Sequence, residues 1–415
     1  MKKLVITGGV PLSGEVTVSG FKNAALPILY ATVLTGGVSV IENLPQIRDV
    51  AATLRILQSI GAVVLFFEPH TVLVDTRSVA PCRAPDGEVS ALRASSYLLG
   101  AELARFGRAR VATPGGCRIG ARPLNIHCAV LRALGAEVKE EGGAISAVAD
   151  RLHGADITLP LPSVGATVNA ILAATLAEGT TTLHGAAREP HIVDLCRYLN
   201  TCGANIHGAG ESEICITGVS RLHGGPYTLM PDMIEAGTFL TAVGAAGGEI
   251  SLLGAAPEHL VSLIGPLRAM GLEIREERER IVAARHGLLF PFDLTAGPYP
   301  ALPTDMHPQL AALALFATGK SRLRDTVFPD RFRYTRELRR MGGTLSVSDG
   351  SVTVTPSRLH GSRVRAVDLR AGAALAVAAL GTRGKTVIGE AATLARGYED
   401  LAGKLAAIGV AVEVK

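Results

Sequence analysis

The chain alternates between helical segments that are apolar on every side and helical segments that carry one apolar face. Almost wholly apolar runs such as "AALPILYATVL", "VNAILAATLA" and "AGAALAVAALG" predict helices that are buried all round. Segments such as "DVAATLRILQSIG" and "HIVDLCRYLNTCG" mix apolar and polar residues at helical spacing, which predicts amphipathic helices packed on a sheet by one face. Short alternating stretches such as "AVVLFFE" and "TVLVD" predict strands.

This pattern repeats along the chain. The amphipathic segment ends six times at an apolar-Gly-small motif, at Gly61, Gly135, Gly203, Gly271, Gly342 and Gly409. Successive glycines lie 67 to 74 residues apart, which indicates six copies of one unit. In the first copy we expect Asp49 to be the N-cap of the amphipathic helix and Gly61 to form its C-terminal cap.

The order of elements within a copy predicts the fold. Each copy runs from buried helix to strand, amphipathic helix and two further strands. Three buried helices inside a ring of three sheets make one domain, so six copies predict an α/β protein of two similar domains. The opening strands precede the first copy, and we expect them to complete the last copy and to bring the termini together.

Composition excludes several classes of protein. Hydrophobic residues make up 48% of the 415 residues and charged residues 19%, so the chain can bury a large core. The 41 cations are spread along the chain and aromatics are only 4%, which argues against a nucleic-acid-binding protein. No apolar stretch reaches the length of a secretory signal or a membrane span. The six cysteines are expected to be reduced thiols of a cytoplasmic protein, and no Cys/His spacing matches a metal site.

Cations open three of the buried helices. Lys22, Arg93 and Arg370 each stand at the start of an apolar helical run. The helix dipole makes that end positive, so a cation there is disfavoured by about 0.3–1 kcal/mol unless an anion binds nearby. The pattern therefore predicts a phosphate or carboxylate site, with snorkelling of each side chain to solvent as the alternative.

The stretch "TPGGCRIGARP" places Cys117 among glycines and arginines. A structural cysteine prefers an apolar, rigid setting, whereas a thiol near cations is more readily ionised and more reactive. The position therefore predicts a reactive thiol on a loop, with a buried inert thiol as the alternative.

From end to end, the chain resembles the UDP-N-acetylglucosamine 1-carboxyvinyltransferases (the MurA family) of the enolpyruvyl transferase superfamily. The motifs that carry the resemblance are "SGFKNAALPI", "ALRAS", "PGGCRIGARPL", "PSVGATVNAILAA", "AAREPHIVDL", "PDMIEAGTF", "PTDMHPQ", "TVFPDRF", "VDLRAGAAL" and "ARGYEDL". The resemblance implies a two-domain inverse α/β barrel built from six βαβαββ repeats. Domain I would cover residues 20–229 with the Cys117 loop, and domain II residues 1–19 and 230–415.

The resemblance also implies a reaction. Enolpyruvyl passes from phosphoenolpyruvate to the 3-hydroxyl of UDP-N-acetylglucosamine by addition and elimination, and phosphate is released. This is the first committed step of peptidoglycan synthesis, which links the family to cell wall biogenesis, cell shape and cell division. The resemblance implies no cofactor, no metal, no nucleic acid, no membrane and no obligate protein partner, and a cytoplasmic location.

The resemblance assigns roles to individual residues. Cys117 would be the proton donor to C3 or govern product release, and would be the residue alkylated by fosfomycin; Asp305 would be the base on the 3-hydroxyl. The residues implied for phosphoenolpyruvate are Lys22, Asn23, Arg122, Arg331, Asp368, Arg370 and Arg396. Those implied for UDP-N-acetylglucosamine are Arg93, Arg122, Pro123, Leu124, Asn125, Ile126, Ser163, Val164, Gly165, Asp305 and Val327. Within this scheme Asp368 would orient Lys22, and Asn23 would also meet the sugar.

Other interpretations of these residues remain. Asp305 and Asp368 each precede an apolar helix, so N-capping would also explain them. Arg331 lies in the charged run "DRFRYTRELRR", which is typical of a solvated face.

Two departures from the family pattern lie on the nucleotide side. Asn125 stands where the family usually has an Asp that accepts from uracil, and Leu161 where part of the family has Lys. They leave open an enolpyruvyl transferase for another nucleotide or nucleotide sugar. A shikimate-pathway enolpyruvyl transferase and a non-catalytic sugar-nucleotide-binding paralogue are further alternatives.

Overall fold

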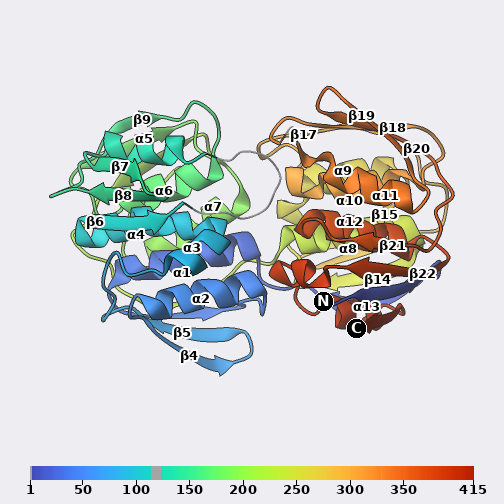
Figure 1. The fold of residues 1–415 in the computed structure, drawn as a ribbon, viewed down its shortest axis with the longest axis horizontal. Coiled ribbons are helices and arrows are strands. Elements are labelled where there is room, and N and C mark those ends of the chain that lie inside the picture. Colours follow the sequence, from blue (N-terminus) through green and yellow to red (C-terminus); the bar gives the residue numbers. More distant parts are fainter. Residues whose placement is uncertain (1, 114–122, 329) are drawn as a thin grey trace. The chain divides into compact units, whose positions relative to one another are not determined.

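The structure is a computed structural model that describes residues 2–113, 123–328 and 330–415. The described residues form two compact units, which Figure 1 shows coloured along the sequence. The N-terminal unit comprises 20–113 and 123–230, and the C-terminal unit comprises 2–19 together with the described part of 231–415. Each unit combines helices with three sheets among its described residues.

Three buried helices form the centre of the N-terminal unit. These are α1 (Lys22–Thr35), α4 (Tyr97–Phe106) and α6 (Val164–Ala174), and each packs against the other two. Amphipathic helices α2 (Arg48–Ser59), α5 (Asn125–Ala133) and α7 (Pro190–Thr201) each pack on the strand that follows them. Short helical segments α3 (Asp86–Ala91) and η1 (Arg93–Ser96) precede α4. The predicted division into apolar and amphipathic helices is confirmed.

The strands of this unit form three sheets among the described residues. Their orders are β13-β3-β5-β4, β6-β8-β7 and β11-β12-β10-β9. The strands are β3 (Val38–Glu42), β4 (Val63–Glu68), β5 (Thr71–Asp75), β6 (Arg108–Ala112), β7 (Glu137–Glu141), β8 (Ala144–Val148), β9 (Asp156–Thr158), β10 (Thr180–His184), β11 (Asn205–His207), β12 (Glu213–Thr217) and β13 (Pro226–Thr228).

The C-terminal unit repeats this plan. Buried helices α8 (Met233–Ala246), α10 (His307–Ala314) and α12 (Leu369–Leu380) pack on one another. The helices α9 (Val261–Ala269), α11 (Tyr334–Arg340) and α13 (Leu401–Ala407) pack on the strands that follow them. Short 3-10 turns are η2 (Pro257–His259), η3 (Thr304–Met306), η4 (Arg331–Arg333) and η5 (Ala391–Arg396).

The sheets of the C-terminal unit have the orders β15-β16-β14-β2, β17-β18-β20-β19 and β21-β22-β1-β23. The strands are β1 (Leu4–Gly8), β2 (Leu12–Thr17), β14 (Gly248–Leu253), β15 (Glu273–Glu277), β16 (Arg280–Arg285), β17 (Asp293–Ala296), β18 (Ser321–Asp325), β19 (Thr344–Ser348), β20 (Ser351–Thr355), β21 (Arg363–Arg365), β22 (Gly384–Gly389) and β23 (Ala411–Val414).

The opening strands complete two different repeats. Strand β1 pairs antiparallel with β22 and β23, so the prediction that the N-terminus completes the last repeat is confirmed. Strand β2 instead pairs parallel with β14 in the fourth repeat, so the prediction that both opening strands complete the last repeat is wrong for β2. The backbones of Lys3 and Lys415 exchange hydrogen bonds of 2.6 and 2.9 Å, which brings the two ends of the chain together as expected (Figure 1).

The repeated glycines share one hydrogen-bond pattern. In the first repeat Gly61 has a φ of 109°, its N–H donates to the Gln58 carbonyl, and the Ala62 N–H donates to the Leu57 carbonyl. This pair of bonds is the Schellman motif. The same pair closes the amphipathic helix at each of the other five glycines, Gly135, Gly203, Gly271, Gly342 and Gly409, all with positive φ. The same capping motif therefore ends the amphipathic helix in all six repeats. The predicted Gly61 cap is confirmed.

Two local predictions are wrong. Asp49 is not the N-cap of α2, because Ile47 holds that position and Asp49 lies in the first turn with its carboxylate paired to Lys22. Arg93 does not open an α-helix directly, because it begins the 3-10 turn η1 that leads into α4 at Tyr97.

Candidate active site

Lys22 is the first residue of α1, as the sequence predicts. The N-cap position is held by Phe21, whose side chain carries no hydrogen-bonding group. The Lys22 Nζ lies 2.6 Å from Asp49 Oδ2, and the two side chains are 12% and 7% exposed. The ammonium thus adds positive charge at a helix end that is already positive, and Asp49 balances it. Asn23 is the next residue of α1 and is half-buried.

The predicted nucleotide residues gather at helix starts within the N-terminal unit. Arg93 Nη2 donates to the Pro123 carbonyl over 3.5 Å, which links η1 to the segment before α5. Leu124 is the N-cap of α5 and is buried, whereas Asn125 is exposed and Ile126 is half-buried.

A third segment begins α6. Ser163 is its N-cap, and the Ser163 Oγ accepts from the Ala166 N–H over 3.4 Å. Val164 and Gly165 form the first turn. A Cβ on Gly165 would lie 2.7 Å from Cε1 of His127, so the ring of this α5 residue packs directly on the α6 backbone. The structure therefore brings the starts of η1, α5 and α6 together.

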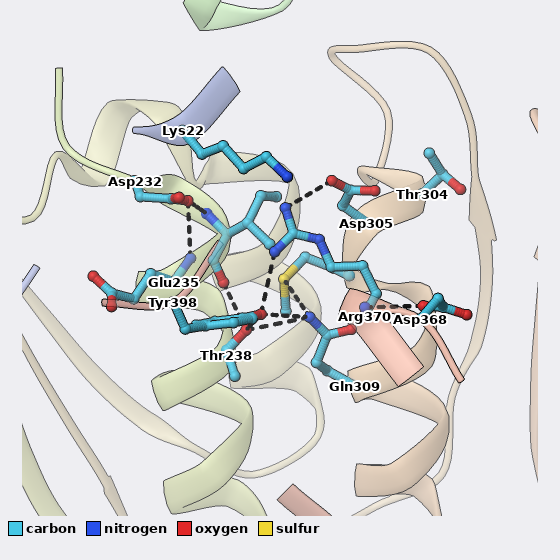
Figure 2. A network of polar contacts seen from close by, with 12 residues as sticks. Lys22, Asp232, Glu235, Thr238, Thr304, Asp305, Gln309, Asp368, Arg370 and Tyr398 are labelled. Carbon is cyan, nitrogen blue, oxygen red and sulfur yellow. Dashed lines mark hydrogen bonds and ion pairs between the residues drawn. The ribbon is translucent and has the colours of Figure 1, made fainter. Parts of the chain in front are cut away.

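Asp305 forms the centre of a charged cluster in the C-terminal unit (Figure 2). Its Oδ1 accepts from Arg331 Nη2 over 2.5 Å, and its Oδ2 accepts from Arg370 Nη2 over 2.9 Å. The arginine side chains are only 3% and 5% exposed, whereas that of Asp305 is 27% exposed. Arg331 is therefore not on a solvated face, and Asp305 binds two guanidinium groups in place of capping a helix.

The electrostatic consequence is strong. Burial alone would raise the pKa of Asp305, but Arg370 and Arg331 together hold it well below its usual range. Burial disfavours the charge on Arg370, yet Asp305 and its neighbours raise the pKa of that guanidinium above its ordinary value. Asp305 and Arg370 are therefore both charged across the physiological pH range.

Two residues that the sequence pattern does not single out, Thr304 and Asp325, hold Arg331 in place. Arg331 Nη1 donates to Thr304 Oγ1 over 2.7 Å, and Thr304 Oγ1 donates to Asp325 Oδ2 over 2.5 Å. Asp325 Oδ1 accepts from the backbone N–H groups of Val327 and Phe328 over 2.8 and 2.9 Å. Asp325 thus connects the predicted sugar contact Val327 to the Arg331–Asp305 pair. Thr304 lies within the motif "PTDMHPQ", but a neutral hydroxyl gives no charge signal in a sequence.

Tyr398 supports Arg370 from the buried side. Arg370 Nη1 donates to the Tyr398 hydroxyl over 3.3 Å, and that hydroxyl shares a 2.9 Å hydrogen bond with Thr238 Oγ1. Gln309 Nε2 donates to Thr238 Oγ1 over 3.2 Å. Figure 2 shows these side chains below the Asp305–Arg370 contact. Near Arg370, burial raises the pKa of the α8 N-cap Asp232 to about 6, and the arginine partly offsets this rise.

Two further predicted residues lie in this unit. Asp368 is the N-cap of α12, and its Oδ1 accepts from the N–H groups of Arg370 and Ala371 over 3.0 and 2.8 Å. N-capping is therefore one role of Asp368. Arg396 is the last residue of η5 and is half-buried. Cys117 and Arg122 lie outside the described residues.

Within the described ranges, no three His, Cys, Asp or Glu side chains are arranged to hold a metal ion. In the same part of the chain, no helix has the length and apolar character needed to cross a membrane.

Comparison with known proteins gives the family. The sequence profile of the EPSP synthase (3-phosphoshikimate 1-carboxyvinyltransferase) family matches residues 6–405. The chain belongs to this family of enolpyruvyl transferases. Within it, a UDP-N-acetylglucosamine 1-carboxyvinyltransferase of Nitratidesulfovibrio vulgaris (strain DP4) is 46% identical over 418 residues, which is 99% of both chains. Another protein of that name, from Halothermothrix orenii, is 44% identical over 99% of this chain and 98% of its own.

Solved structures agree with the fold. The enolpyruvyl transferase NikO from Streptomyces tendae matches with a TM-score of 0.90 at 29% identity, over 100% of this chain and 99% of its own. EPSP synthase from Acinetobacter baumannii matches all of both chains with a TM-score of 0.77 at 20% identity, which supports the fold alone. The predicted enolpyruvyl transferase fold of six repeats is confirmed.

Proposed function

We propose that the chain transfers enolpyruvyl from phosphoenolpyruvate to the 3-hydroxyl of UDP-N-acetylglucosamine, with release of phosphate. The observation that carries the proposal is the buried cluster in which Asp305 binds both Arg331 and Arg370. Two anionic substrates require fixed cations in a site of low water content, and a hydroxyl nucleophile requires a nearby base. The full-length relatives named UDP-N-acetylglucosamine 1-carboxyvinyltransferase support UDP-N-acetylglucosamine as the acceptor.

The reaction proceeds in two steps. The C3 carbon of phosphoenolpyruvate takes a proton while the sugar 3-hydroxyl adds to C2 and gives up its own proton. The tetrahedral adduct then loses phosphate from C2 and a proton from C3, which leaves an enolpyruvyl ether. Asp305 takes the hydroxyl proton, and its basicity rises when a substrate anion draws hydrogen bonds away from Arg331 and Arg370.

The remaining roles follow the family pattern. Lys22, Arg122 and Arg396 hold the phosphate of phosphoenolpyruvate, Asn23 meets the sugar, and Asp368 orients Lys22 in addition to capping α12. The nucleotide sugar lies against Arg93, residues 122–126, residues 163–165 and Val327. Each compact unit is one enolpyruvyl transferase domain. The protein acts in the cytoplasm in peptidoglycan synthesis, and through it in cell shape and cell division.

Cys117 protonates C3 or governs product release, and it is the residue that fosfomycin alkylates. Mass spectrometry after incubation with fosfomycin and UDP-N-acetylglucosamine tests this role. We expect a single adduct on Cys117, and a Cys117→Asp variant that resists the drug while it keeps some activity, because a carboxyl can donate a proton but opens an epoxide poorly. An adduct on Cys82 or Cys215 instead would contradict the assignment.

An alternative acceptor has one specific observation in its favour. Asn125 is exposed at the start of α5, where the family usually places an Asp that accepts from uracil. An Asn carbonyl oxygen can still accept that hydrogen bond. Phosphate release from phosphoenolpyruvate separates the possibilities when UDP-N-acetylglucosamine, other UDP-sugars, UMP and shikimate 3-phosphate are offered in turn. Release with the first alone supports the proposal, release with another acceptor replaces it, and release with none identifies a non-catalytic protein.

A further inference from the structure

A buried amide lies within the apolar helix α6. Asn169 is 0% exposed, and its neighbours along the helix are Val168, Ala170 and Ile171. A buried amide is costly unless its donors and acceptor are all hydrogen-bonded, so its partners indicate what the residue does. Neither charge nor periodicity distinguishes Asn169 in the sequence.

Asn169 joins the two sides of the η1–α4 junction. Its Oδ1 accepts from the Gly100 N–H over 2.8 Å, and its Nδ2 donates to the Ser96 carbonyl over 3.1 Å. These are the N–H and the carbonyl that the first regular hydrogen bond of α4 would join. The side chain therefore bridges the point at which the 3-10 turn becomes an α-helix. Close packing accompanies the bridge, since a Cβ on Gly100 would lie 2.8 Å from Asn169 Oδ1.

The same amide orients His127 on α5. The Gly100 N–H can only donate and the Ser96 carbonyl can only accept, so the two partners fix which amide atom is Oδ1 and which is Nδ2. Asn169 Nδ2 lies 2.8 Å from His127 Nδ1. The Nδ1 atom must then accept, which places the ring proton on Nε2. The fixed ring packs on Gly165, whose added Cβ would lie 2.8 Å from that Nε2 atom.

We infer that Asn169 is a positioning residue for the proposed nucleotide site, and this inference rests on the proposed function. Through Ser96 it fixes the turn that begins at Arg93, and through His127 it fixes the start of α5. Its own helix carries the N-cap Ser163. Three segments proposed to bind UDP therefore share one buried amide, which acts from beneath them and touches no substrate.

The consequence for the kinetics is specific. A residue that orients nucleotide-binding segments contributes to binding of the nucleotide in the ground state and the transition state alike. Its loss raises the KM for the nucleotide sugar and leaves kcat almost unchanged. A merely structural residue of the core would lower the amount of folded enzyme and leave the KM of the folded fraction as it was.

The experiment compares Asn169→Leu and the milder Asn169→Ser with the control Thr175→Val. Thr175 is the C-cap of α6, about 9 Å further along the helix axis than Asn169. It is 1% exposed and its Oγ1 donates to the Ile171 carbonyl over 2.7 Å, so the control also loses a buried hydrogen bond. Full-length protein is titrated with UDP by calorimetry, and phosphate release is measured at varied UDP-N-acetylglucosamine and at varied phosphoenolpyruvate.

We expect the Asn169 variants to weaken UDP binding and raise the KM for the nucleotide sugar about tenfold or more, with kcat and the KM for phosphoenolpyruvate within about threefold. The control Thr175→Val is expected to match the wild type in UDP affinity and in the KM for the nucleotide sugar. Unchanged UDP binding in a folded Asn169→Ser protein would overturn the inference, as would an equal loss in Thr175→Val. Failure of the wild type to bind UDP would instead refute the proposed function, so the two failures are distinguishable.

Discussion

At the scale of single residues, Asp305 shows how its neighbours set the chemistry of a carboxylate. Two buried arginines bind its two oxygens, so the carboxylate is firmly ionised and is a weak base while these contacts last. An anion that competes for the arginines restores its basicity. Under the proposed function, the base is thus coupled to the arrival of an anionic substrate.

The substitution Asp305→Ala tests this role. We expect turnover to fall by about 10²–10⁴-fold, because a base acts mainly in the transition state, while the affinity for UDP-N-acetylglucosamine stays within about tenfold. Steady-state phosphate release and calorimetry measure the two quantities. Near-normal turnover in a folded variant would rule out Asp305 as the base. Thr304→Val leaves Asp305 in place but removes the hydroxyl that holds Arg331. Its turnover should lie between that of Asp305→Ala and that of the wild type.

Glu102 is a second residue whose surroundings shift its titration. It lies on α4 with 0% exposure, and its Oε2 accepts from the Cys82 N–H over 3.0 Å. Burial raises the pKa of Glu102 to about 7, although backbone N–H groups of Cys82 and Arg110 partly offset the rise. The unfolded chain releases this proton near pH 4.5. The contribution of Glu102 to the free energy of unfolding is therefore fully present below about pH 4.5, and it is lost as the pH rises to about 7.

Glu102→Gln removes that loss because an amide does not ionise. We expect the variant to be more stable than the wild type at pH 8, by about 3 kcal/mol, and the difference to vanish or reverse near pH 4.5. Urea unfolding at the two pH values measures it. Glu88→Gln, a change at an exposed position on α3, is the control and should show little difference at either pH. A difference for Glu102→Gln that does not depend on pH would contradict the shifted pKa.

At the scale of elements, the six Schellman motifs explain why the sequence revealed the repeat. Each motif needs a positive φ, which glycine adopts with little strain, so glycine marks the same point of every repeat. Apolar and amphipathic helices were equally predictable, because burial on all sides or on one side sets their composition. The N-cap of α2 could not be predicted, because Asp49 pairs with Lys22, which lies in another helix.

Two of these glycines give a matched pair of substitutions. Gly135 and Gly61 have similar φ values of 97° and 109°. An added Cβ on Gly135 would meet its nearest atom at 3.7 Å, whereas one on Gly61 would lie 2.6 Å from the Ser78 carbonyl oxygen. We expect Gly135→Ala to cost about 1–2 kcal/mol from the backbone alone, and Gly61→Ala to cost at least about 1 kcal/mol more. Equal losses in denaturant unfolding would show that the close approach at Gly61 carries no energy.

Two substitutions of Asp368 distinguish its capping of α12 from its proposed role in orienting Lys22. Asp368→Ala should cost about 1 kcal/mol of stability because two capping hydrogen bonds are lost. Asp368→Asn keeps an acceptor for the cap but removes the charge that would orient Lys22. We expect Asp368→Asn to be as stable as the wild type in thermal unfolding and at least about tenfold slower in phosphate release. Full activity in Asp368→Asn would leave capping as its function.

At the scale of the whole molecule, the sequence predicts the repeats and singles out Asp305, Arg331 and Arg370, which the structure brings into one cluster. The polar contacts that surround this cluster could not be predicted. Thr304 and Asn169 carry no charge, and Asp325 is one acidic residue among many. Their partners lie 21 to 73 residues away along the chain. Only the folded chain brings such side chains together. The place of β2 in the fourth repeat was missed for the same reason, because strand pairing depends on which edge a neighbouring repeat leaves open.

The central claim is that this chain forms an enolpyruvyl ether on a nucleotide sugar, and the structure of the product tests it most directly. Full-length protein is incubated with UDP-N-acetylglucosamine and phosphoenolpyruvate labelled with carbon-13 at C2, and the product is examined by NMR. The account predicts a vinyl ether whose labelled carbon couples to the proton on C3 of the sugar, together with one free phosphate for each product. Phosphate without that coupling, or a label attached at another oxygen, would contradict it.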